Sequence, residues 1–367
     1  MTIRQNLLRS LAGQPAPPVY LAYDWFIQNR AIDWASLFQQ GLGRINHASL
    51  IRFHYPHLQI VESDSMENGR PRRDVRWVTD VGELHEYYLD GWKQQHFIRA
   101  PEDYRVAQRA FQDAVFTLDE TAFNASEQSV GEGGITLGQF GAFGQLGFTR
   151  TPFQVVQIDL AGLEQFSLDI ASETPELLDL LAQMNEQFLQ IFRIARQAKA
   201  VYFKLWENLS IETMGPRLYH THLVPVYEKI FEILGDDKKL IVHYDGKLGL
   251  IADAIARLPF HGIDSLTPPP EGDLTIAQAR AVWPDKFLWI HPTLSWDSLS
   301  DADLADRITQ TVRDAGGTRC CLELSEEVPP HWPRTVPLIL DTLRRLAWEP
   351  PFEERRFPNP PSNLFVP

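Results

Sequence analysis

The feature that most constrains the fold of this chain is a succession of apolar runs, each followed by a segment with helical periodicity. Five strand–helix units follow one another, and their strand-like runs cover residues 198–208, 238–246, 260–266, 286–292 and 318–325. The runs are nearly continuous in apolar residues, a pattern typical of strands buried on both faces of a parallel sheet. Serial units of this kind indicate an α/β architecture.

The length of the chain, 367 residues, helps to choose among α/β folds. It suits a closed (β/α)8 barrel, or TIM barrel, with three earlier strands at residues 17–24, 113–119 and 133–141. Residues 48–100 are polar and aromatic, and the turn at Asp80-Val81-Gly82 indicates a β-hairpin. We therefore predict a single domain over residues 1–367, with residues 48–100 inserted near the barrel mouth. A doubly wound sheet is the alternative, although no glycine-rich phosphate turn follows the first strand.

Charge and cysteine content narrow the functional classes. The formal charge of −14 argues against nucleic acids and anionic membranes as partners, because both need basic surfaces. No apolar run reaches the length of a transmembrane helix, and the N-terminal residues lack the features of a signal peptide. The two cysteines, Cys320 and Cys321, are sequence neighbours and therefore poor partners for a disulfide. We expect a reduced, cytoplasmic protein of enzyme size.

Polar residues stand where the strands of the expected barrel end, which is where (β/α) barrels carry their active sites. Acids, a histidine and an amide occupy these ends: Asp24, Glu207, Asn208, Asp264, His291 and Glu326. His243 and Asp245 close another strand, and side chains at i and i+2 of a strand point to the same face. We therefore expect these two to emerge together. The whole collection suits metal binding or proton transfer.

A purely structural interpretation is open for several of these groups. Asp245 could cap the following helix, while His243 could be a core histidine bonded to a carbonyl. Glu207 could cap the helix that begins near Pro216, although the two lie too far apart in the sequence for a direct cap. Trp206 could line a pocket for a flat ligand or belong to the core.

Several motifs, in this order, resemble the uroporphyrinogen decarboxylase superfamily. They are WEN after a strand (206–208), PRLYHTHLVPVYEKI on a helix (216–230), HYDG after a strand (243–246), PPPEGDLTIAQARAVWPDK (268–286) and SEEVPP (325–330). The similarity is strongest over residues 199–346 and fainter over the opening helix and strand and over residues 152–192. The order and spacing are characteristic of the superfamily and not of one reaction.

The resemblance implies a (β/α) barrel of one of two kinds. One kind decarboxylates uroporphyrinogen without a cofactor. The other kind comprises zinc-dependent methyltransferases that exchange methyl groups with a corrinoid protein. The methyltransferases bind zinc through a His-x-Cys after the fifth strand and a second Cys after the eighth. By that pattern His243 is a metal ligand, Asp245 takes the position of the first cysteine, and Glu326 lies near the second.

On this resemblance we expect a metal-dependent methyltransferase that works with a corrinoid protein. The metal would be divalent, with zinc as the first choice, and its ligands would be His243, Asp245 and Glu326. Glu207 would be a further ligand or a general acid, and His243 and Asp245 would also be catalytic. Asn208 and Trp206 would contact the cofactor. A homodimer is expected at the level of the family.

Two alternatives stay open. The first is metal-free decarboxylation of a porphyrinogen or another carboxylic acid, with Asp24, Asp245 and His243 as the catalytic residues. The true decarboxylases carry an arginine-rich segment after the first strand, and the equivalent region here contains only Arg30. The second alternative is a non-catalytic, tetrapyrrole-binding protein. In every case the expected ligand is a small molecule or a tetrapyrrole.

Overall fold

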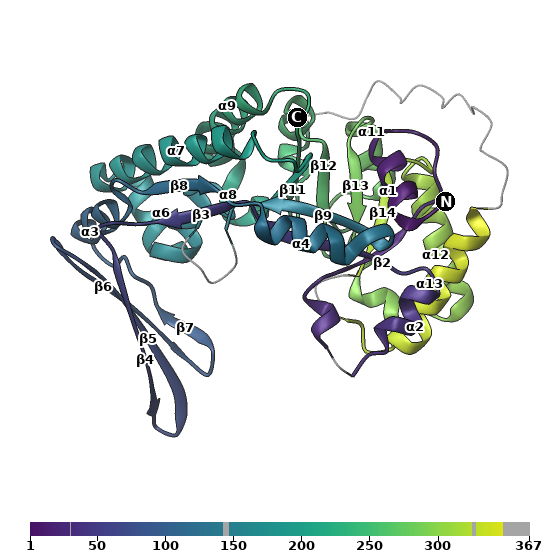
Figure 1. Ribbon diagram of the computed structural model, residues 1–367, viewed down its shortest axis with the longest axis horizontal. Coiled ribbons are helices and arrows are strands. Elements are labelled where there is room, and N and C mark those ends of the chain that lie inside the picture. Colours follow the sequence, from purple (N-terminus) through teal and green to yellow (C-terminus); the bar gives the residue numbers. More distant parts are fainter. Residues whose placement is uncertain (30, 142–146, 325–327, 348–367) are drawn as a thin grey trace.

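The computed structural model describes residues 1–29, 31–141, 147–324 and 328–347 (Figure 1). At its centre, eight parallel strands close into a barrel in the order β1-β14-β13-β12-β11-β10-β9-β2. The barrel strands are β1 (Tyr20–Tyr23), β2 (Gly43–Ser49), β9 (Gly134–Gln139), β10 (Tyr202–Leu205), β11 (Lys239–His243), β12 (Gly262–Leu266), β13 (Phe287–Ile290) and β14 (Cys320–Glu323). The predicted (β/α)8 barrel is confirmed.

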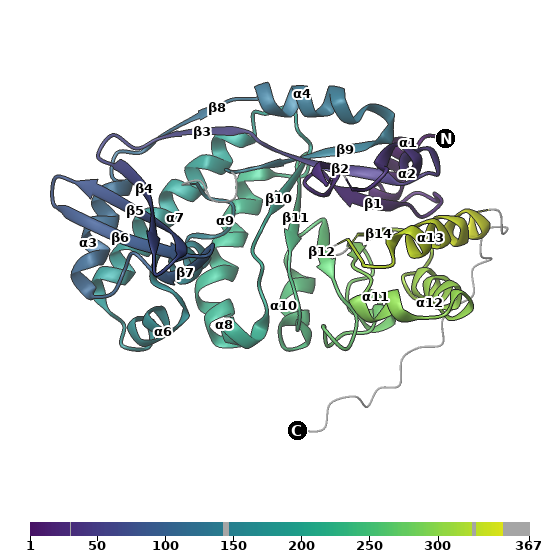
Figure 2. The same ribbon diagram turned by 90° about the horizontal axis from the view of Figure 1, so that it is seen from below.

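Helices surround the barrel, with α4 on one side and α10 to α12 on the other (Figure 2). The helices are α1 (Ile3–Leu11), α2 (Trp34–Gln39), α3 (Pro101–Phe111), α4 (Thr121–Val130), α5 (Pro152–Gln154), α6 (Leu163–Ala171), α7 (Pro175–Ala195), α8 (Ile211–Leu218), α9 (Val224–Leu234), α10 (Ala252–Arg257), α11 (Ile276–Val282), α12 (Asp301–Asp314) and α13 (Trp332–Leu346). In α12 the buried residues Leu304, Ile308 and Val312 recur every four positions, so one stripe of the helix packs inward. Thr275 and Gln278 form a reciprocal capping box at the start of α11.

The second barrel strand is not the one that the sequence predicts. Residues 113–119 contain β8 (Val115–Leu118), which pairs antiparallel with β3 (Ile51–His54) outside the barrel. The barrel instead uses β2, whose sequence GRINHAS has no continuous apolar run. The apolar content of β8 misled the prediction because this strand is only partly covered, with Val115 half exposed. Helix α4 packs over β2 and β9 and supplies partners for their polar residues. The Ser126 hydroxyl of α4 accepts a hydrogen bond from the side-chain amide of Asn46 on β2 and shares another with the Thr136 hydroxyl on β9.

The predicted hairpin is present and belongs to a larger sheet. Four antiparallel strands form it: β4 (Gln59–Glu67), β5 (Arg70–Thr79), β6 (Gly82–Leu89) and β7 (Trp92–Gln95). The turn between β5 and β6 lies at residues 80 and 81, as the sequence predicts. The sheet projects away from the barrel in Figure 1. The assignment of residues 48–100 as an insertion within one domain stays a prediction.

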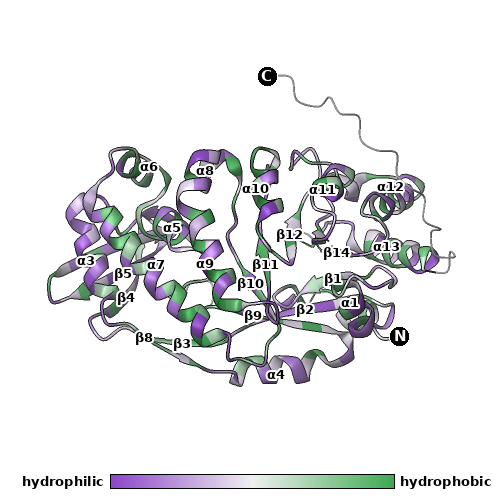
Figure 3. Cartoon of the chain, turned by 90° about the horizontal axis from the view of Figure 1, so that it is seen from above, coloured by the Kyte–Doolittle hydropathy of each residue, from purple (hydrophilic) through white to green (hydrophobic). Residues whose placement is uncertain are grey.

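Hydropathy follows this layering. In Figure 3 the barrel strands β10 and β11 are largely hydrophobic, whereas α4 is mainly hydrophilic on its outward side. Within the described part of the chain, every helix is too short or too polar to span a lipid bilayer.

Candidate active site at the mouth of the barrel

Each barrel strand brings one polar side chain to its carboxyl end, where the side chains meet inside the barrel. In strand order along the chain they are Tyr23, His47, Gln139, Lys204, His243, Asp264, His291 and Glu323. All of these side chains are buried. Buried polar groups need partners. His47 pairs with Asp24, and Gln139 accepts a hydrogen bond from Trp206. The other six side chains form one hydrogen-bonded and ionic network: Tyr23, Lys204, His243, Asp264, His291 and Glu323.

The centre of the network is an ion pair between Lys204 and Asp264. The Nζ atom of Lys204 lies 2.6 Å from Oδ2 of Asp264, and neither side chain is exposed to solvent. The same ammonium sits 3.6 Å from the ring centroid of Trp206, a cation–π contact. Burial opposes ionisation of Asp264, but the charges of Lys204 and His243 outweigh it and hold the pKa of this carboxyl far below its usual range.

His243 lies between two carboxylates. Its Nδ1 contacts Oδ2 of Asp264, and its Nε2 is 3.2 Å from Oδ1 of Asp245. Burial lowers the pKa of His243, but the two carboxylates overcome it and raise the pKa to about 9. The prediction that His243 and Asp245 emerge together is therefore confirmed. Without a metal, the imidazole is a cation that neutralises its carboxylate neighbours.

A bulge in β12 positions Asp245. The register between β12 and β13 shifts between Ile263 and Leu266, and Ser265 within the bulge has a φ of +65°. A left-handed conformation at a non-glycine residue costs roughly 1–3 kcal/mol, and such strain is concentrated at functional sites. It turns the Ser265 hydroxyl toward Asp245, whose Oδ1 accepts a hydrogen bond at 2.6 Å. The same hydroxyl lies 3.1 Å from Nδ1 of His291.

Tyr23, His291 and Glu323 form a neutral side of the network. The Tyr23 hydroxyl is 3.1 Å from Oε2 of Glu323 and 3.0 Å from Nε2 of His291. Burial lowers the pKa of His291 to about 4, so this imidazole is neutral. Burial, reinforced by the charge of Asp264, raises the pKa of Glu323 well above its usual range, so this carboxyl carries a proton. Its Oε1 has no hydrogen-bond partner among the described residues.

Asp24 lies at the edge of the mouth and pairs with His47. Its Oδ1 is 3.2 Å from Nδ1 of His47, and its Oδ2 accepts a hydrogen bond from the His47 backbone N–H at 3.1 Å. Burial opposes ionisation of Asp24, but the bonds from His47 lower its pKa. Burial and the charge of Lys204 lower the pKa of His47 to about 4. Asp24 is therefore an ionised, partly exposed carboxylate beside the cluster of His243.

The remaining predicted site residues lie at the end of β10. The ring of Trp206 is 4.9 Å from that of His243, and its Nε1 donates to Gln139 at 2.8 Å. The backbone N–H of Asn208 donates to the carbonyl of His243 at 3.0 Å, so Asn208 supports the site through its main chain. The roles predicted for these residues stay predictions.

Glu207 points to the other side of the strand from Trp206, as consecutive strand residues do. It is fully buried and accepts hydrogen bonds from the backbone and hydroxyl of Thr151 and from the hydroxyl of Tyr227. Burial raises the pKa of Glu207 to about 7, against the effect of these hydrogen bonds. The structure places Glu207 in the barrel wall, where Thr151 and Tyr227 are its hydrogen-bond partners. Its predicted role as ligand or general acid stays a prediction.

Two of the three predicted metal ligands can be tested for their fit to a metal, because Glu326 lies outside the described residues. Tetrahedral zinc with bonds of about 2.0–2.2 Å separates its ligand atoms by roughly 3.3–3.6 Å. The 3.2 Å between His243 and Asp245 is close to that separation. Asp264 on the other ring nitrogen supplies the carboxylate–histidine arrangement typical of metal-bound histidines. In the described part of the chain, no group of three His, Cys, Asp or Glu residues could hold a metal. The two described ligands fit a divalent ion that takes a third ligand from elsewhere.

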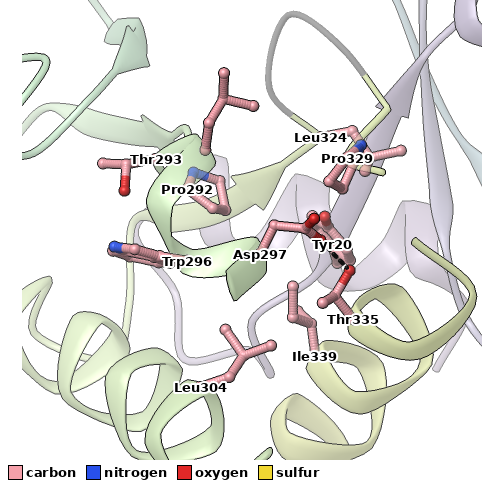
Figure 4. A pocket seen from close by; sticks show the side chains of 11 residues that line it. Tyr20, Pro292, Thr293, Trp296, Asp297, Leu304, Leu324, Pro329, Thr335 and Ile339 are labelled. Atoms are coloured by element: carbon pink, nitrogen blue, oxygen red, sulfur yellow. Dashed lines mark hydrogen bonds between the residues drawn. The ribbon is translucent and has the colours of Figure 1, made fainter. Parts of the chain in front are cut away.

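A separate small cavity lies between the outer face of the barrel and helices α12 and α13 (Figure 4). Its volume is about 20 Å³, room for about one water molecule. Asp297 accepts a hydrogen bond from Thr335 at 3.2 Å in its wall. The cavity is too small for a substrate, so it is structural.

No family model and no curated protein sequence matches the chain. Among solved structures, the chain is similar to a methyltransferase from Methanosarcina mazei, with 13% sequence identity and a TM-score of 0.56. The match covers 94% of this chain and 99% of the other. A protein assigned as a vitamin-B12 independent methionine synthase from Listeria monocytogenes matches 60% of this chain and 61% of its own, with 14% identity and a TM-score of 0.32. At 13% identity, the likeness to the Methanosarcina protein concerns the barrel fold.

Proposed function

We propose that this protein is a methyl-transfer enzyme that holds a divalent metal, with zinc as the first choice, at His243 and Asp245. The observation that carries the proposal is the alignment of Asp264, His243 and Asp245 at the barrel mouth. One nitrogen of His243 is fixed by a buried carboxylate, and the other faces a second carboxylate across 3.2 Å. The barrel shared with the Methanosarcina methyltransferase is consistent with this activity.

The ligand chemistry favours a particular kind of methyl donor. Nitrogen and oxygen ligands make a harder metal site than thiolates do, and hard sites prefer oxygen partners. When bound, the metal would act as a Lewis acid on the oxygen that leaves the methyl group. The protein residues would keep this site in place. Asp264 orients the ring of His243, and Ser265 orients the carboxylate of Asp245.

The wall of the mouth is suited to a flat partner. Tyr23 and Trp25 stack with ring centroids 4.3 Å apart, and Trp25 is 38% exposed. Trp206 lies 5.4 Å from Trp25 on the inner side. An aromatic methyl donor or the ring of a corrinoid on a partner protein would bury this exposed aromatic surface. We therefore propose a corrinoid protein as the methyl acceptor.

A second candidate function is metal-free decarboxylation, favoured by the ion pair of Lys204 with Asp264 beside His243. In that reaction the bond between carbon and the carboxylate breaks, CO₂ leaves, and the electron pair stays on the carbon. A proton held at His243 would then move to that carbon, and the Lys204 ammonium would stabilise the developing negative charge. A non-catalytic tetrapyrrole-binding role stays a third prediction.

Metal analysis of the purified protein tests the proposal. We expect close to one divalent ion per chain in the wild type and loss of that ion in His243→Ala, Asp245→Asn and Glu326→Gln. His57→Ala is the matched control. His57 pairs with Asp113, and both lie on connections between elements outside the barrel strands, so this substitution should leave the metal content unchanged. Cobalt(II) substitution adds a spectroscopic readout, since its visible bands report nitrogen and oxygen coordination.

Metal content, activity and ligand binding of the wild type separate the candidate functions. The methyl-transfer proposal would be refuted in favour of the second candidate by two results together. The wild type would contain no metal, and it would still decarboxylate a carboxylic acid after treatment with a chelator. Saturable binding of cobalamin or porphyrin with no turnover of any methyl donor or acid would support the binding role instead.

A further inference from the structure

A cavity of about 650 Å³ lies between the four-stranded sheet and the segment that follows β9. On the sheet side, alternate residues of β5 and β6 face it, among them Val75, Trp77 and Tyr88. On the other side it is lined by Arg150 and by the π-helical turn η3 (Val155–Ala161). Its size falls within the range of pockets that hold small organic ligands.

Arg150 in this wall is buried, and its ion pair with Asp159 is too long for a hydrogen bond. The residue is 7% exposed, and its Nε has no hydrogen-bond partner among the described residues. Its nearest acidic neighbour is Asp159, whose Oδ1 is 3.8 Å from Nη1, beyond hydrogen-bond distance. A buried guanidinium with unused donors costs free energy unless an acceptor arrives.

The other cations of the wall are already paired. The pairs are Arg72–Asp74 at 2.6 Å, Arg73–Glu62 at 2.9 Å and Lys93–Glu86 at 2.7 Å. Among the described cations of the cavity, Arg150 is therefore the one whose ion pair, 3.8 Å long to Asp159, is too long for a hydrogen bond and whose Nε has no described partner. Its planar fork of donors matches a carboxylate or a phosphate.

The apolar part of the wall defines the rest of the ligand. Trp77 and Phe97 pack with ring centroids 4.5 Å apart, and both are buried. Tyr88 is partly exposed on the same face of the sheet and lines the cavity farther along β6, opposite Arg73. Aromatic walls beside one buried cation select a flat, apolar body that carries one anionic group.

We propose that this cavity binds a small aromatic anion, with its anionic group on Arg150 and its ring against the aromatic wall formed by Trp77 and Phe97. This site is separate from the metal candidates, and it exists whether or not the chain transfers methyl groups. The two residues on either side of Arg150, Thr149 and Thr151, connect this cavity to the barrel wall. Thr149 accepts a hydrogen bond from the backbone of Trp206 at 2.8 Å, and Thr151 donates to Glu207 at 3.2 Å.

Calorimetric titration with benzoate, phenyl phosphate and uncharged benzamide tests the proposal. We expect saturable binding of at least one of the two anions and at least about 10-fold weaker binding of benzamide, since a charged hydrogen bond is lost. The result for benzoate against phenyl phosphate decides which anionic group the site prefers. No saturable binding of either anion at millimolar concentration would overturn the proposal.

Two variants test the assigned residue. Arg150→Met should weaken binding of the preferred anion at least about 10-fold, whereas Arg73→Met, which removes a cation that is half exposed and paired, should change it less than about 3-fold. Equal affinity in Arg150→Met and the wild type would overturn the proposal.

Photolabelling of the wild type provides a test that does not depend on folding of the variants. Irradiation with 4-azidobenzoate, followed by peptide mapping, should label residues 71–97 or 147–160, and excess benzoate or phenyl phosphate should suppress the labelling. Labels confined to peptides of the barrel mouth, such as residues 202–208, would contradict the assignment of the cavity.

Discussion

Replacing Lys204 with methionine tests whether the ionic centre of the barrel is as closely coupled as its geometry indicates. Lys204 and Asp264 lie 2.6 Å apart, and neither is exposed to solvent. Methionine keeps much of the volume of lysine and removes its charge. Asp264 then keeps the contact with His243 but loses its second cation.

Removing one partner of a buried ion pair costs about 3–5 kcal/mol, because the other charge stays buried without full compensation. We therefore expect the free energy of unfolding of Lys204→Met to fall by about that amount. Lys247→Met is the matched control, since its ion pair with Glu212 is largely exposed and its loss should change stability little. Asp264→Asn in the Lys204→Met background should recover part of the loss.

Urea titration followed by tryptophan fluorescence measures these changes, and circular dichroism should give the same transition if unfolding is cooperative. The double-mutant cycle of Lys204→Met with Asp264→Asn should give a coupling energy of about 2–3 kcal/mol. A loss below about 1 kcal/mol in Lys204→Met, or additive effects of the two substitutions, would refute the coupling that the distances imply.

Two further predictions concern titratable groups outside the cluster. Burial raises the pKa of Glu207 from 4.5 to about 7, so the folded protein keeps a proton that the unfolded chain loses. Stability should therefore fall as pH rises through that window, and Glu207→Gln should flatten the difference in Tm between about pH 5 and about pH 8; an unchanged difference would contradict the assignment. Burial raises the pKa of the Cys320 thiol to about 11 and that of the Cys321 thiol well above its usual value. Native protein should thus react slowly with Ellman's reagent, whereas unfolded protein should react rapidly at both thiols; rapid native reaction would refute their burial.

The barrel could be predicted from the sequence because most of its strands are apolar runs with regular spacing. The exception shows the limit of that signal. Strand β2 carries Arg44, Asn46 and His47, which point to polar partners, so no apolar run reveals it. The hydrogen-bond partners of Arg44 and Asn46 lie on a helix that is distant in sequence, so no local sequence pattern identifies the strand.

The site could be predicted in part, for a related reason. Spacing alone predicted that His243 and Asp245 emerge together, because His243 ends β11, Asp245 follows two residues later, and strand periodicity is a local property. Lys204, Tyr23 and Glu323 were missed, since they act through neighbours on other strands. A lysine in the middle of an apolar strand is the one signal that could have revealed Lys204, because buried lysines require a charged partner.

The charges of the cluster also decide what a metal site here would need. Without metal, the cations Lys204 and His243 balance the carboxylates Asp264 and Asp245, and the protonated Glu323 adds no charge. A divalent ion that displaces the proton of His243 leaves one excess positive charge in a buried site, which is costly. A third carboxylate, such as that of the predicted ligand Glu326, would remove that excess, whereas metal-free decarboxylation does not need one. Loss of metal in Glu326→Gln would therefore favour methyl transfer, and full activity of that variant would favour decarboxylation.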